Sequence, residues 1–216
     1  MFDLAISPSG EMFVADWENG RLLRFQNGSG DVVADNADAT ALFYSPSGVL
    51  YAMRQNGRAV AKLVGSTLQT VIASESLPPD MQFSAYQVFV TKEEVIYLSD
   101  YLNFNPRILC INPAESLEPV VVGQIQTEGP SVRMDLFVTD CGTIYVTELI
   151  QRKVLAFHPS SQTFTEVLQC PDGFQPSALL VQDRSLYVGM LMQTVDGETW
   201  TGKVCEYLLP PELQLQ

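Results

Sequence analysis

The 216-residue sequence has a single histidine, four cysteines and no long apolar run. One histidine excludes a zinc site built from several histidines, although a Ser-His-Asp triad that includes His158 stays open on composition. The cysteines are too few for a disulfide scaffold, and no two of them form a C-x-x-C pair. We therefore expect four reduced structural thiols at Cys110, Cys141, Cys170 and Cys205.

Basic residues are also scarce, with 12 lysines and arginines against 25 aspartates and glutamates and a net charge of −13. A surface this acidic repels phosphate backbones and anionic lipids, so we expect no nucleic-acid partner and no membrane partner. No apolar run approaches the roughly 20 residues that a membrane-spanning helix needs. The first residues, Met1 to Gly10, lack the features of a secretory signal. The sequence thus favours a soluble, cytoplasmic monomer.

Five segments of the chain share one pattern of apolar and polar residues. Each begins with an apolar triplet: Leu4-Ala5-Ile6, Leu42-Phe43-Tyr44, Val88-Phe89-Val90, Leu136-Phe137-Val138 and Leu179-Leu180-Val181. An aromatic follows after a short polar turn, at Phe13, Tyr51, Tyr97, Tyr145 and Tyr187, with spacings of 38, 46, 48 and 42 residues. A basic residue then opens a third apolar segment, at Arg21, Arg58, Arg107, Lys153 and Lys203. This regular spacing indicates a repeat architecture.

The apolar runs of the repeat are short, rich in β-branched and aromatic residues, and separated by turn-forming residues, which is typical of strands. Two of the turns have the same sequence, Ser-Pro-Ser-Gly, at Ser7–Gly10 and Ser45–Gly48. The first strand of each repeat is apolar at consecutive positions, so we expect neighbouring sheets to cover both of its faces. No long amphipathic helix is visible.

Repeats of about 40 to 45 residues with four strands each predict an all-β protein with the β-propeller fold. We expect one domain of five four-stranded blades, with approximate boundaries at 1–37, 38–81, 82–130, 131–174 and 175–216. The last blade would end in a weak strand around Leu213. The alternative is part of a six-bladed propeller.

The sequence of the first repeat, Phe2 to Phe25, resembles an NHL repeat, and Met134 to Phe157 resembles a second copy. Propellers of the regucalcin and gluconolactonase group share much of this sequence pattern. The NHL resemblance implies a non-enzymatic module that binds a protein or peptide through its loop face. The second resemblance implies a metal-dependent lactone or ester hydrolase. A third alternative is a ligand-sensing propeller from a larger receptor kinase.

An acidic residue ends the second strand of three repeats, at Asp16, Asp100 and Glu148. Carboxylates that converge on a propeller axis could bind Ca²⁺, which takes six to eight oxygen ligands. Asparagine or arginine follows each acid within a few residues, which favours charge-assisted hydrogen bonds across the loop. We therefore expect loop-stabilising acceptors and no metal or cofactor. The expected donors are Asn19 and Arg21, Asn105 and Arg107, and Arg152.

The loops after the second strands are of uneven length and carry large aromatic side chains. The fifth repeat has the longest one, Leu191 to Gly202. Exposed aromatics on a rigid scaffold are typical anchors of protein interfaces. We expect the binding face to carry Trp17, Tyr101, Phe104, Phe174 and Trp200. His158 precedes Pro159 at a strand end, where we expect a surface turn. No G-x-S-x-G, P-loop or G-x-G-x-x-G motif supports acyl transfer or nucleotide binding.

Overall fold

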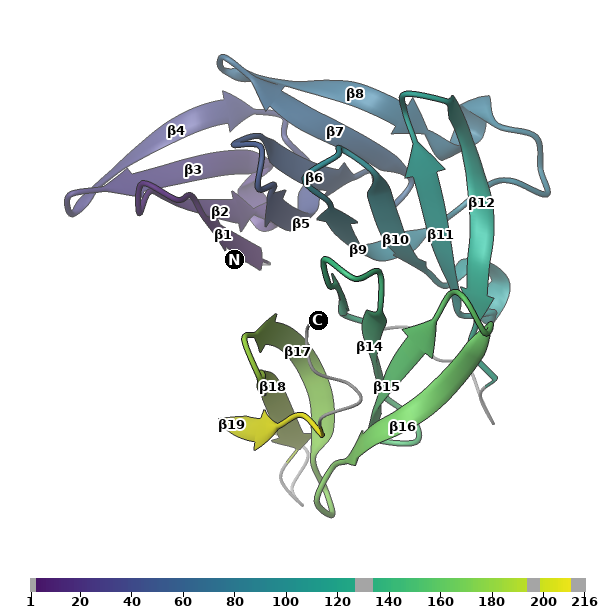
Figure 1. Cartoon of the computed structure of the whole chain (residues 1–216). Helices are drawn as coiled ribbons and strands as arrows, with labels where there is room; N and C mark the ends of the chain where they lie inside the picture. The colour runs from purple at the N-terminus through teal and green to yellow at the C-terminus, as the bar shows by residue number, and fades with distance from the viewer. Residues whose placement is uncertain (1–2, 127–133, 194–198, 211–216) are drawn as a thin grey trace. The chain divides into compact units, whose positions relative to one another are not determined.

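The computed structural model describes residues 3–126, 134–193 and 199–210, and these form nineteen β-strands and three 3₁₀-helices with no α-helix (Figure 1). The predicted all-β class is therefore confirmed. Within this part of the chain, no helix is long and apolar enough to cross a membrane. The structure divides into two compact units. Unit 1 comprises residues 1–102 and 108–121, and unit 2 comprises residues 103–107 and 122–216.

Unit 1 contains three antiparallel sheets of consecutive strands, up to residue 121. Sheet 1 consists of β1 (Asp3–Ile6), β2 (Met12–Asp16), β3 (Arg21–Gln26) and β4 (Ser29–Asp35). Sheet 2 consists of β5 (Ala39–Tyr44), β6 (Leu50–Arg54), β7 (Ala59–Val64) and β8 (Thr67–Ala73). Sheet 3 consists of β9 (Ala85–Val90), β10 (Ile96–Asp100), β11 (Arg107–Asn112) and β12 (Ser116–Gln124). The 3₁₀-helices are η1 (Trp17–Asn19), η2 (Ser74–Ser76) and η3 (Leu102–Phe104).

Unit 2 contains the end of β12 and two further sheets. Sheet 4 consists of β13 (Leu136–Val138), β14 (Ile144–Glu148), β15 (Lys153–His158) and β16 (Thr163–Gln169). Sheet 5 has three described strands, β17 (Gln175–Gln182), β18 (Ser185–Gln193) and β19 (Trp200–Leu208). The fourth strand expected around Leu213 lies outside the described residues.

The Ser-Pro-Ser-Gly turns join the first and second strands of sheets 1 and 2 in the same way. In the first turn, the Gly10 N–H donates to the carbonyl of Ser7 at 2.9 Å, and the Glu11 N–H donates to the Ser7 hydroxyl at 3.0 Å. Gly10 has a φ of +84°, a left-handed conformation that an L side chain rarely adopts. The first serine of the motif therefore accepts the hydrogen bonds of the turn, and the glycine allows the backbone to bend.

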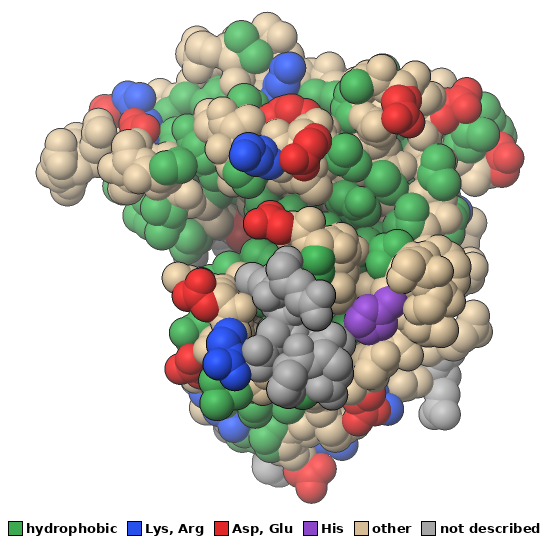
Figure 2. All heavy atoms as spheres, viewed as in Figure 1, with side chains coloured by type: hydrophobic (Ala, Val, Ile, Leu, Met, Phe, Trp, Pro, Cys, Tyr) green, Lys and Arg blue, Asp and Glu red, His purple; other side chains and the backbone are tan. Residues whose placement is uncertain are grey.

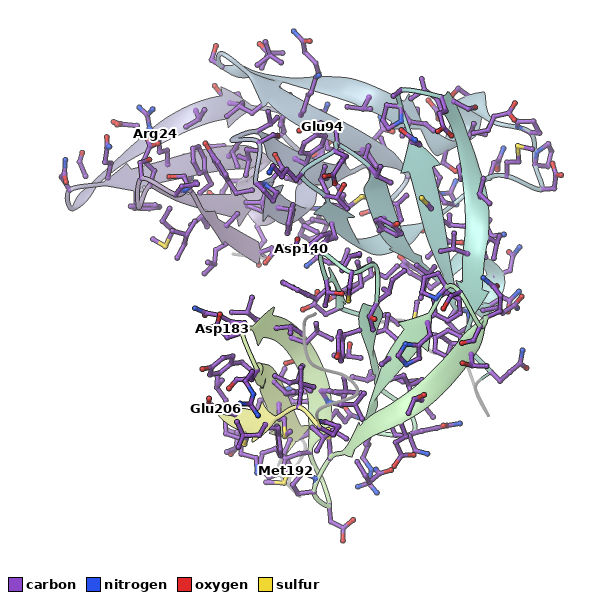
Figure 3. The ribbon with its side chains drawn as sticks, viewed as in Figure 1. Arg24, Glu94, Asp140, Asp183, Met192 and Glu206 are labelled. Atoms are coloured by element: carbon purple, nitrogen blue, oxygen red, sulfur yellow. The ribbon has the colours of Figure 1, made fainter. Side chains whose placement is uncertain are left out.

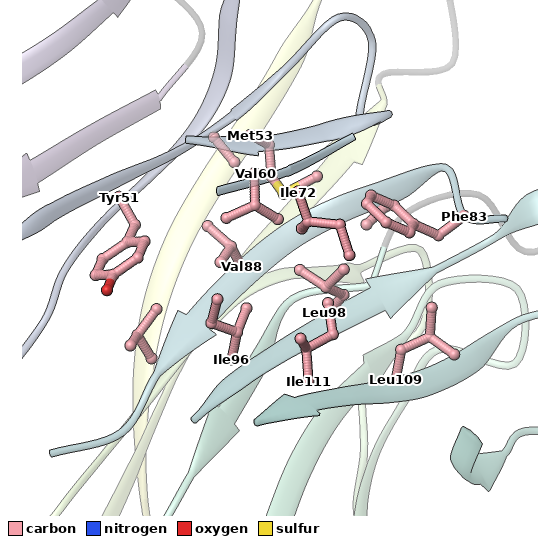
Figure 4. Close-up of a cluster of buried hydrophobic side chains, with 13 residues drawn as sticks. Tyr51, Met53, Val60, Ile72, Phe83, Val88, Ile96, Leu98, Leu109 and Ile111 are labelled. Carbon is pink, nitrogen blue, oxygen red and sulfur yellow. The ribbon is translucent and has the colours of Figure 1, made fainter. Parts of the chain in front are cut away.

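Two apolar cores hold the sheets of unit 1 together. One lies between sheets 1 and 2 and includes Phe13, Leu22, Leu42 and Leu50. The other lies between sheets 2 and 3 and is shown in Figure 4; it comprises Ala41, Tyr51, Met53, Val60, Ile72, Phe83, Ala85, Val88, Val90, Ile96, Leu98, Leu109 and Ile111. Each fully buried side chain of this size contributes about 1.5 to 3 kcal/mol. These cores make the three sheets a rigid support for the loops at their ends.

A polar contact also joins sheets 2 and 3 in unit 1. The carboxylate of Glu94, labelled in Figure 3, accepts hydrogen bonds from the hydroxyls of Ser47 and Tyr51. Burial of the Tyr51 ring, together with the negative charge of Glu94, raises the pKa of the phenol above its ordinary value. The phenol therefore stays protonated and continues to donate at neutral pH.

Unit 2 has one core, between sheets 4 and 5. It contains Tyr145, Val154, Ala156, Cys170, Leu179, Val181, Leu186, Val188, Met190 and Leu209. The alternation of these residues along β17 and β18 means that each strand turns one face to this core. The remaining face of sheet 5 carries Leu180, Val204 and Leu208, which are exposed.

Not every first strand is covered on both faces, contrary to our expectation. In β1, Ala5 packs in the core with sheet 2, while Leu4 and Ile6 are 44% and 60% exposed. Leu180 of β17 is exposed in the same way. The reason is that sheet 2 covers one face of sheet 1 and sheet 4 covers one face of sheet 5. Figure 2 shows hydrophobic side chains at the surface over β1 to β3.

The described ends of the long loop expected at Leu191 to Gly202 are strands. Register pairs continue from Leu191 with Gly202 to Gln193 with Trp200, so β18 and β19 extend into the segment. Tryptophan and threonine, at Trp200 and Thr201, are enriched in strands, which favours extended pairing here over a loop. Residues 194–198 lie outside the described part of the chain.

Side chains at the start of two first strands link neighbouring sheets, a feature that the sequence analysis missed. The Asp3 carboxylate accepts the N–H of Leu4 in its own strand and, at 2.8 Å, the N–H of Leu42 in sheet 2. In unit 2 the Asp135 carboxylate accepts the N–H of Leu136 and, at 2.7 Å, the N–H of Leu179 in sheet 5. Both acids stand directly before the leucine of an apolar triplet, and this shared Asp-Leu pair was the available signal.

The pH dependence of stability should report on Asp3. Burial raises the pKa of its carboxyl, although the N–H groups of Leu42 and Leu4 and the Gln87 side chain act against the shift. A raised pKa contributes stability that is full below the ordinary value of 3.8 and is lost as the pH rises through the folded-state value. Urea unfolding should therefore show wild type losing stability relative to Asp3→Asn as the pH rises from 3 to 7. The Asp80→Asn variant, in an exposed loop, controls for net charge, and a difference that does not vary with pH would contradict the assignment.

Candidate functional site

The loop after β2 holds Trp17 at the surface of unit 1. Asp16 ends the strand, and its carboxylate accepts hydrogen bonds from Asn19 Nδ2 at 2.8 Å and from Arg21 Nη2 at 2.7 Å. These are the two donors named in the sequence analysis. The Arg21 and Asn19 hydrogen bonds hold the pKa of Asp16 below its usual value, so this carboxylate is charged at neutral pH. Gly20, at φ +64°, closes the single turn of η1.

Asp100 supports Tyr101 at the corresponding place in sheet 3. Asp100 is completely buried, and its Oδ1 atom accepts the N–H of Ser84 at 2.6 Å and the N–H of Leu102 at 3.3 Å. The Tyr101 N–H in turn donates to the carbonyl of Ser84 at 3.1 Å. These two donors are backbone amides, and donation from the side chains of Asn105 and Arg107 stays a prediction from the sequence. This carboxylate fixes the path of the backbone on both sides of Tyr101.

The partners of Glu148 differ from our expectation. It is completely buried in unit 2, and its carboxylate accepts the N–H groups of Ile150 and Gln151. The expected partner, Arg152, forms an ion pair with Asp172 at 3.5 Å. Arg152 has a left-handed backbone, with a φ of +58°, at the end of a tight turn. That turn brings the backbone amides of 150 and 151 to the carboxylate.

A second wall beside Trp17 is formed by the connection between sheets 1 and 2, which the sequence analysis did not single out. The Ala37 N–H donates to the carbonyl of Gly20 at 2.7 Å. From the other side, Arg54 donates to the carbonyl of Ala37 at 2.6 Å and to that of Asn36 at 2.8 Å. Ala37 is buried by these contacts, while the next residue, Asp38, is exposed with a φ of +45°.

Residues 55–57 form the third wall, with three consecutive left-handed residues. Gln55, Asn56 and Gly57 have φ values of +53°, +54° and +81°. The Gly57 carbonyl accepts the N–H of Ala85 at 2.8 Å, and the Asn56 carbonyl accepts the Ser84 hydroxyl at 3.3 Å. The loop of sheet 2 is therefore fixed against the start of β9. Backbone in these unusual conformations is found preferentially at functional sites.

These three walls enclose two hollows on the same side of unit 1. The first has a volume of about 310 Å³ and is lined by Trp17, Glu18, Asp38, Gln55 and Asn56. The second has a volume of about 100 Å³ and is lined by Thr40, Asn56, Gly57, Ala85, Tyr86 and Tyr101. Because Asn56 lines both, the two hollows are neighbours. We call this surface the Trp17–Tyr101 surface.

The structure thus brings two of the five expected aromatics to one surface and places the others differently. Phe174 lies in unit 2, packs against the core of that unit and has the Lys203 ammonium 4.0 Å above its ring. Trp200, at the start of β19, is 56% exposed and also belongs to unit 2. The side chain of Phe104 lies outside the described residues. Only Trp17, which is 43% exposed, and Tyr101 therefore enter the site described here.

The other candidates for chemistry are His158 and the four cysteines. His158 is at the end of β15, where its carbonyl accepts the N–H of Gln162 at 2.9 Å. The four cysteines are free thiols. In the part of the chain that the structure describes, no group of three or more His, Cys, Asp or Glu side chains could hold a metal ion. The Trp17–Tyr101 surface offers an aromatic face, carboxylates and amides, which suit recognition.

Comparison with solved structures assigns the fold. No family model matches the sequence, and no curated protein matches it. Virginiamycin B lyase from Staphylococcus aureus matches with a TM-score of 0.63 and 15% identity, over 95% of this chain and 69% of the other. A protein described as a candidate gluconolactonase matches with a TM-score of 0.68 and 10% identity, over 99% and 78%. A streptogramin B lyase has a TM-score of 0.59 and 13% identity, over 97% and 83%.

The chain has the β-propeller fold. Each of sheets 1 to 5 corresponds to one propeller blade, so the fold predicted from the sequence is confirmed. At identities of 10 to 15%, the likeness concerns the fold alone. The NHL resemblance is carried by the sequence only. In this propeller, Trp17 and Tyr101 occupy the loops that follow the second strands of the first and third blades.

Proposed function

We propose that this propeller is a binding module that recognises a protein or peptide segment through the Trp17–Tyr101 surface. The observation that carries the proposal is that two aromatic residues border adjoining hollows, in loops fixed by hydrogen bonds to the Asp16 and Asp100 carboxylates. Aromatic side chains bring a large contact area at a small cost in conformational entropy, and they are enriched among the residues that dominate binding energy. A fixed loop adds to affinity because little ordering remains to be done on binding.

The similar structures named above are enzymes by their titles, and a further similar structure is a catalytically inactive histidine-to-alanine variant of virginiamycin B lyase with quinupristin. The alternative function is therefore hydrolysis or elimination of a lactone-type substrate. The residues around the two hollows do not favour it, because Glu18 and Asp38 are the only carboxylates in the lining, and no group of three or more His, Cys, Asp or Glu among the described residues could hold a metal ion. His158 lies in unit 2 at the hairpin of β15 and β16.

Selection of peptides from a random display library tests the proposal. The library is enriched on the wild-type protein alone, and the selected peptides are then measured against a Trp17→Ala, Tyr101→Ala double variant. We expect a recurring sequence that binds wild type and the Val64→Ala control, since Val64 is an exposed apolar residue of sheet 2 outside the hollows. Selected peptides that bind the double variant equally well would contradict the proposal.

Metal removal should leave the protein unchanged. A metal that binds only the native state stabilises it by about 2.7 kcal/mol at a hundredfold excess over Kd, so its loss lowers the melting temperature. We expect the same melting temperature with and without a chelator such as EDTA, measured by calorimetry, and no hydrolysis of simple lactones with added Ca²⁺. A clear fall in melting temperature on chelation, or calcium-dependent hydrolysis, would favour the enzyme alternative.

A further inference from the structure

The first hollow of the Trp17–Tyr101 surface is one-sided in charge. Its lining contains the carboxylates of Glu18 and Asp38, the amides of Gln55 and Asn56 and the Trp17 ring, and no basic residue. All five of these residues are exposed. The hollow therefore presents negative charge and an aromatic ring together to the solvent.

Two arginines close in sequence to the lining residues are held by other groups, and the exposed Arg58, next to Gly57, does not line either hollow. The Arg21 guanidinium donates to the Asp16 carboxylate through both Nε, at 3.2 Å, and Nη2, at 2.7 Å. The Arg54 guanidinium donates to three backbone carbonyls, those of Asn36, Ala37 and Leu68. These arginines position the walls of the hollow, and their donors point to those acceptors.

The two carboxylates are presented by anchored backbone. Glu18 belongs to the single turn of η1. The hydrogen bond from Asn19 to the Asp16 carboxylate and the left-handed Gly20 close this turn. Asp38 follows Ala37, whose amide and carbonyl are both hydrogen-bonded. A site that is fixed before binding loses less conformational entropy when its ligand arrives.

We propose that this hollow receives the cationic side chain of an arginine or lysine that belongs to the bound segment. The proposal rests on the proposed function and specifies the chemistry of the partner. A guanidinium or ammonium group is attracted to the face of a tryptophan ring, and the attraction is stronger for tryptophan than for other aromatics. Carboxylates beside the ring add charge-assisted hydrogen bonds. The net charge of −13 also steers a basic segment towards the protein.

The adjoining hollow favours a peptide segment over a free cation. Tyr86, Tyr101 and Ala85 give the second hollow an apolar character, and Asn56 connects it to the first. A small polyamine would occupy only the charged hollow. A chain with a basic residue followed or preceded by a hydrophobic one fits both, so we expect that sequence among selected peptides.

Fluorescence of Trp17 gives a direct test. The chain has two tryptophans, so the Trp200→Phe variant leaves Trp17 as the only one. Titration with blocked tetrapeptides that carry one arginine and one leucine should change the Trp17 emission. Matched peptides with citrulline, the neutral analogue of arginine, should bind at least about tenfold more weakly. Equal binding of the two peptides would overturn the proposal, as would tighter binding of spermidine or of a neutral sugar.

Removal of the two charges provides the second arm. The Glu18→Gln, Asp38→Asn variant should lose at least about tenfold in affinity for the arginine peptide and lose most of the salt dependence. The Glu75→Gln, Asp80→Asn variant removes the same net charge from exposed residues outside the hollow and should bind like wild type. Equal losses in both variants would overturn the proposal.

The outcomes separate this inference from the proposed function. Selected peptides that depend on Trp17 and Tyr101 but carry no basic residue would refute the cationic site and leave the binding module standing. Selected peptides whose affinity is the same for wild type and for the Trp17→Ala, Tyr101→Ala variant would refute the binding module itself.

Discussion

The Gly57→Ala variant should be less stable than wild type by about 2 to 5 kcal/mol. Gly57 has a φ of +81°, and a Cβ atom added there would lie 2.0 Å from the carbonyl oxygen of Ala85. A left-handed backbone costs an L residue about 1 to 2 kcal/mol, and overpacking a fixed contact costs about 1 to 3 kcal/mol more. The oxygen belongs to β9, which the core between sheets 2 and 3 holds in place, so it cannot move away without disturbing that core. Denaturant unfolding monitored by circular dichroism measures the loss.

Gly48 provides the matched control within the same sheet. Its φ is +90°, but a Cβ atom added there meets nothing within 4 Å. The Gly48→Ala variant should therefore show only the backbone cost, about 1 to 2 kcal/mol. Equal losses in the two variants would show that the loop of residues 55–57 is not packed against β9 as described, and the site would lose its third wall.

The Asp100→Ala variant should lose about 1 to 3 kcal/mol of stability, because it leaves buried backbone donors without their acceptor. Those donors are the N–H groups of Ser84 and Leu102, and Ser84 in turn accepts the N–H of Tyr101. Binding should fall as well, since Tyr101 loses its support. The readouts are the unfolding free energy and the affinity for a selected peptide.

The Asp100→Asn variant separates charge from geometry. Its side-chain oxygen keeps one acceptor in nearly the same position, so it should retain more stability and more peptide affinity than Asp100→Ala. If both variants match wild type in stability and in affinity, the carboxylate does not hold the Tyr101 loop.

The strands of this propeller were accessible from the sequence because their signals are local. Apolar triplets, the Ser-Pro-Ser-Gly turns and the regularly spaced aromatics each act within a few residues, and the strands of all five sheets follow them. The expected cover on both faces of β1 was wrong, because the exposure of Ile6 depends on which sheets are neighbours. The hairpin of β18 and β19 was mistaken for a loop, because length alone does not distinguish a loop from longer strands.

The site was only partly accessible. Trp17 and Tyr101 stand directly after acids that end strands, and the sequence analysis found both. Asp38 and Arg54 were missed, because the contacts of Arg54 are to backbone carbonyls, which every residue has and which leave no mark in the sequence. The backbone amides that donate to the buried acids Asp100 and Glu148 could not be predicted either, because a backbone N–H is present whatever the side chain. The run Gln55-Asn56-Gly57 does carry a turn signal, the Asn-Gly pair, in the sequence.

The affinity of one selected peptide for four proteins tests the central claim most directly. Calorimetric titration of wild type, Trp17→Ala, Tyr101→Ala and the Val64→Ala control, each checked for an unchanged melting temperature, gives the comparison. Truncation of an anchoring aromatic typically costs 2 kcal/mol or more, so each of the two site variants should bind at least about tenfold more weakly, while Val64→Ala binds like wild type. Unchanged affinity in both Trp17→Ala and Tyr101→Ala would contradict the account.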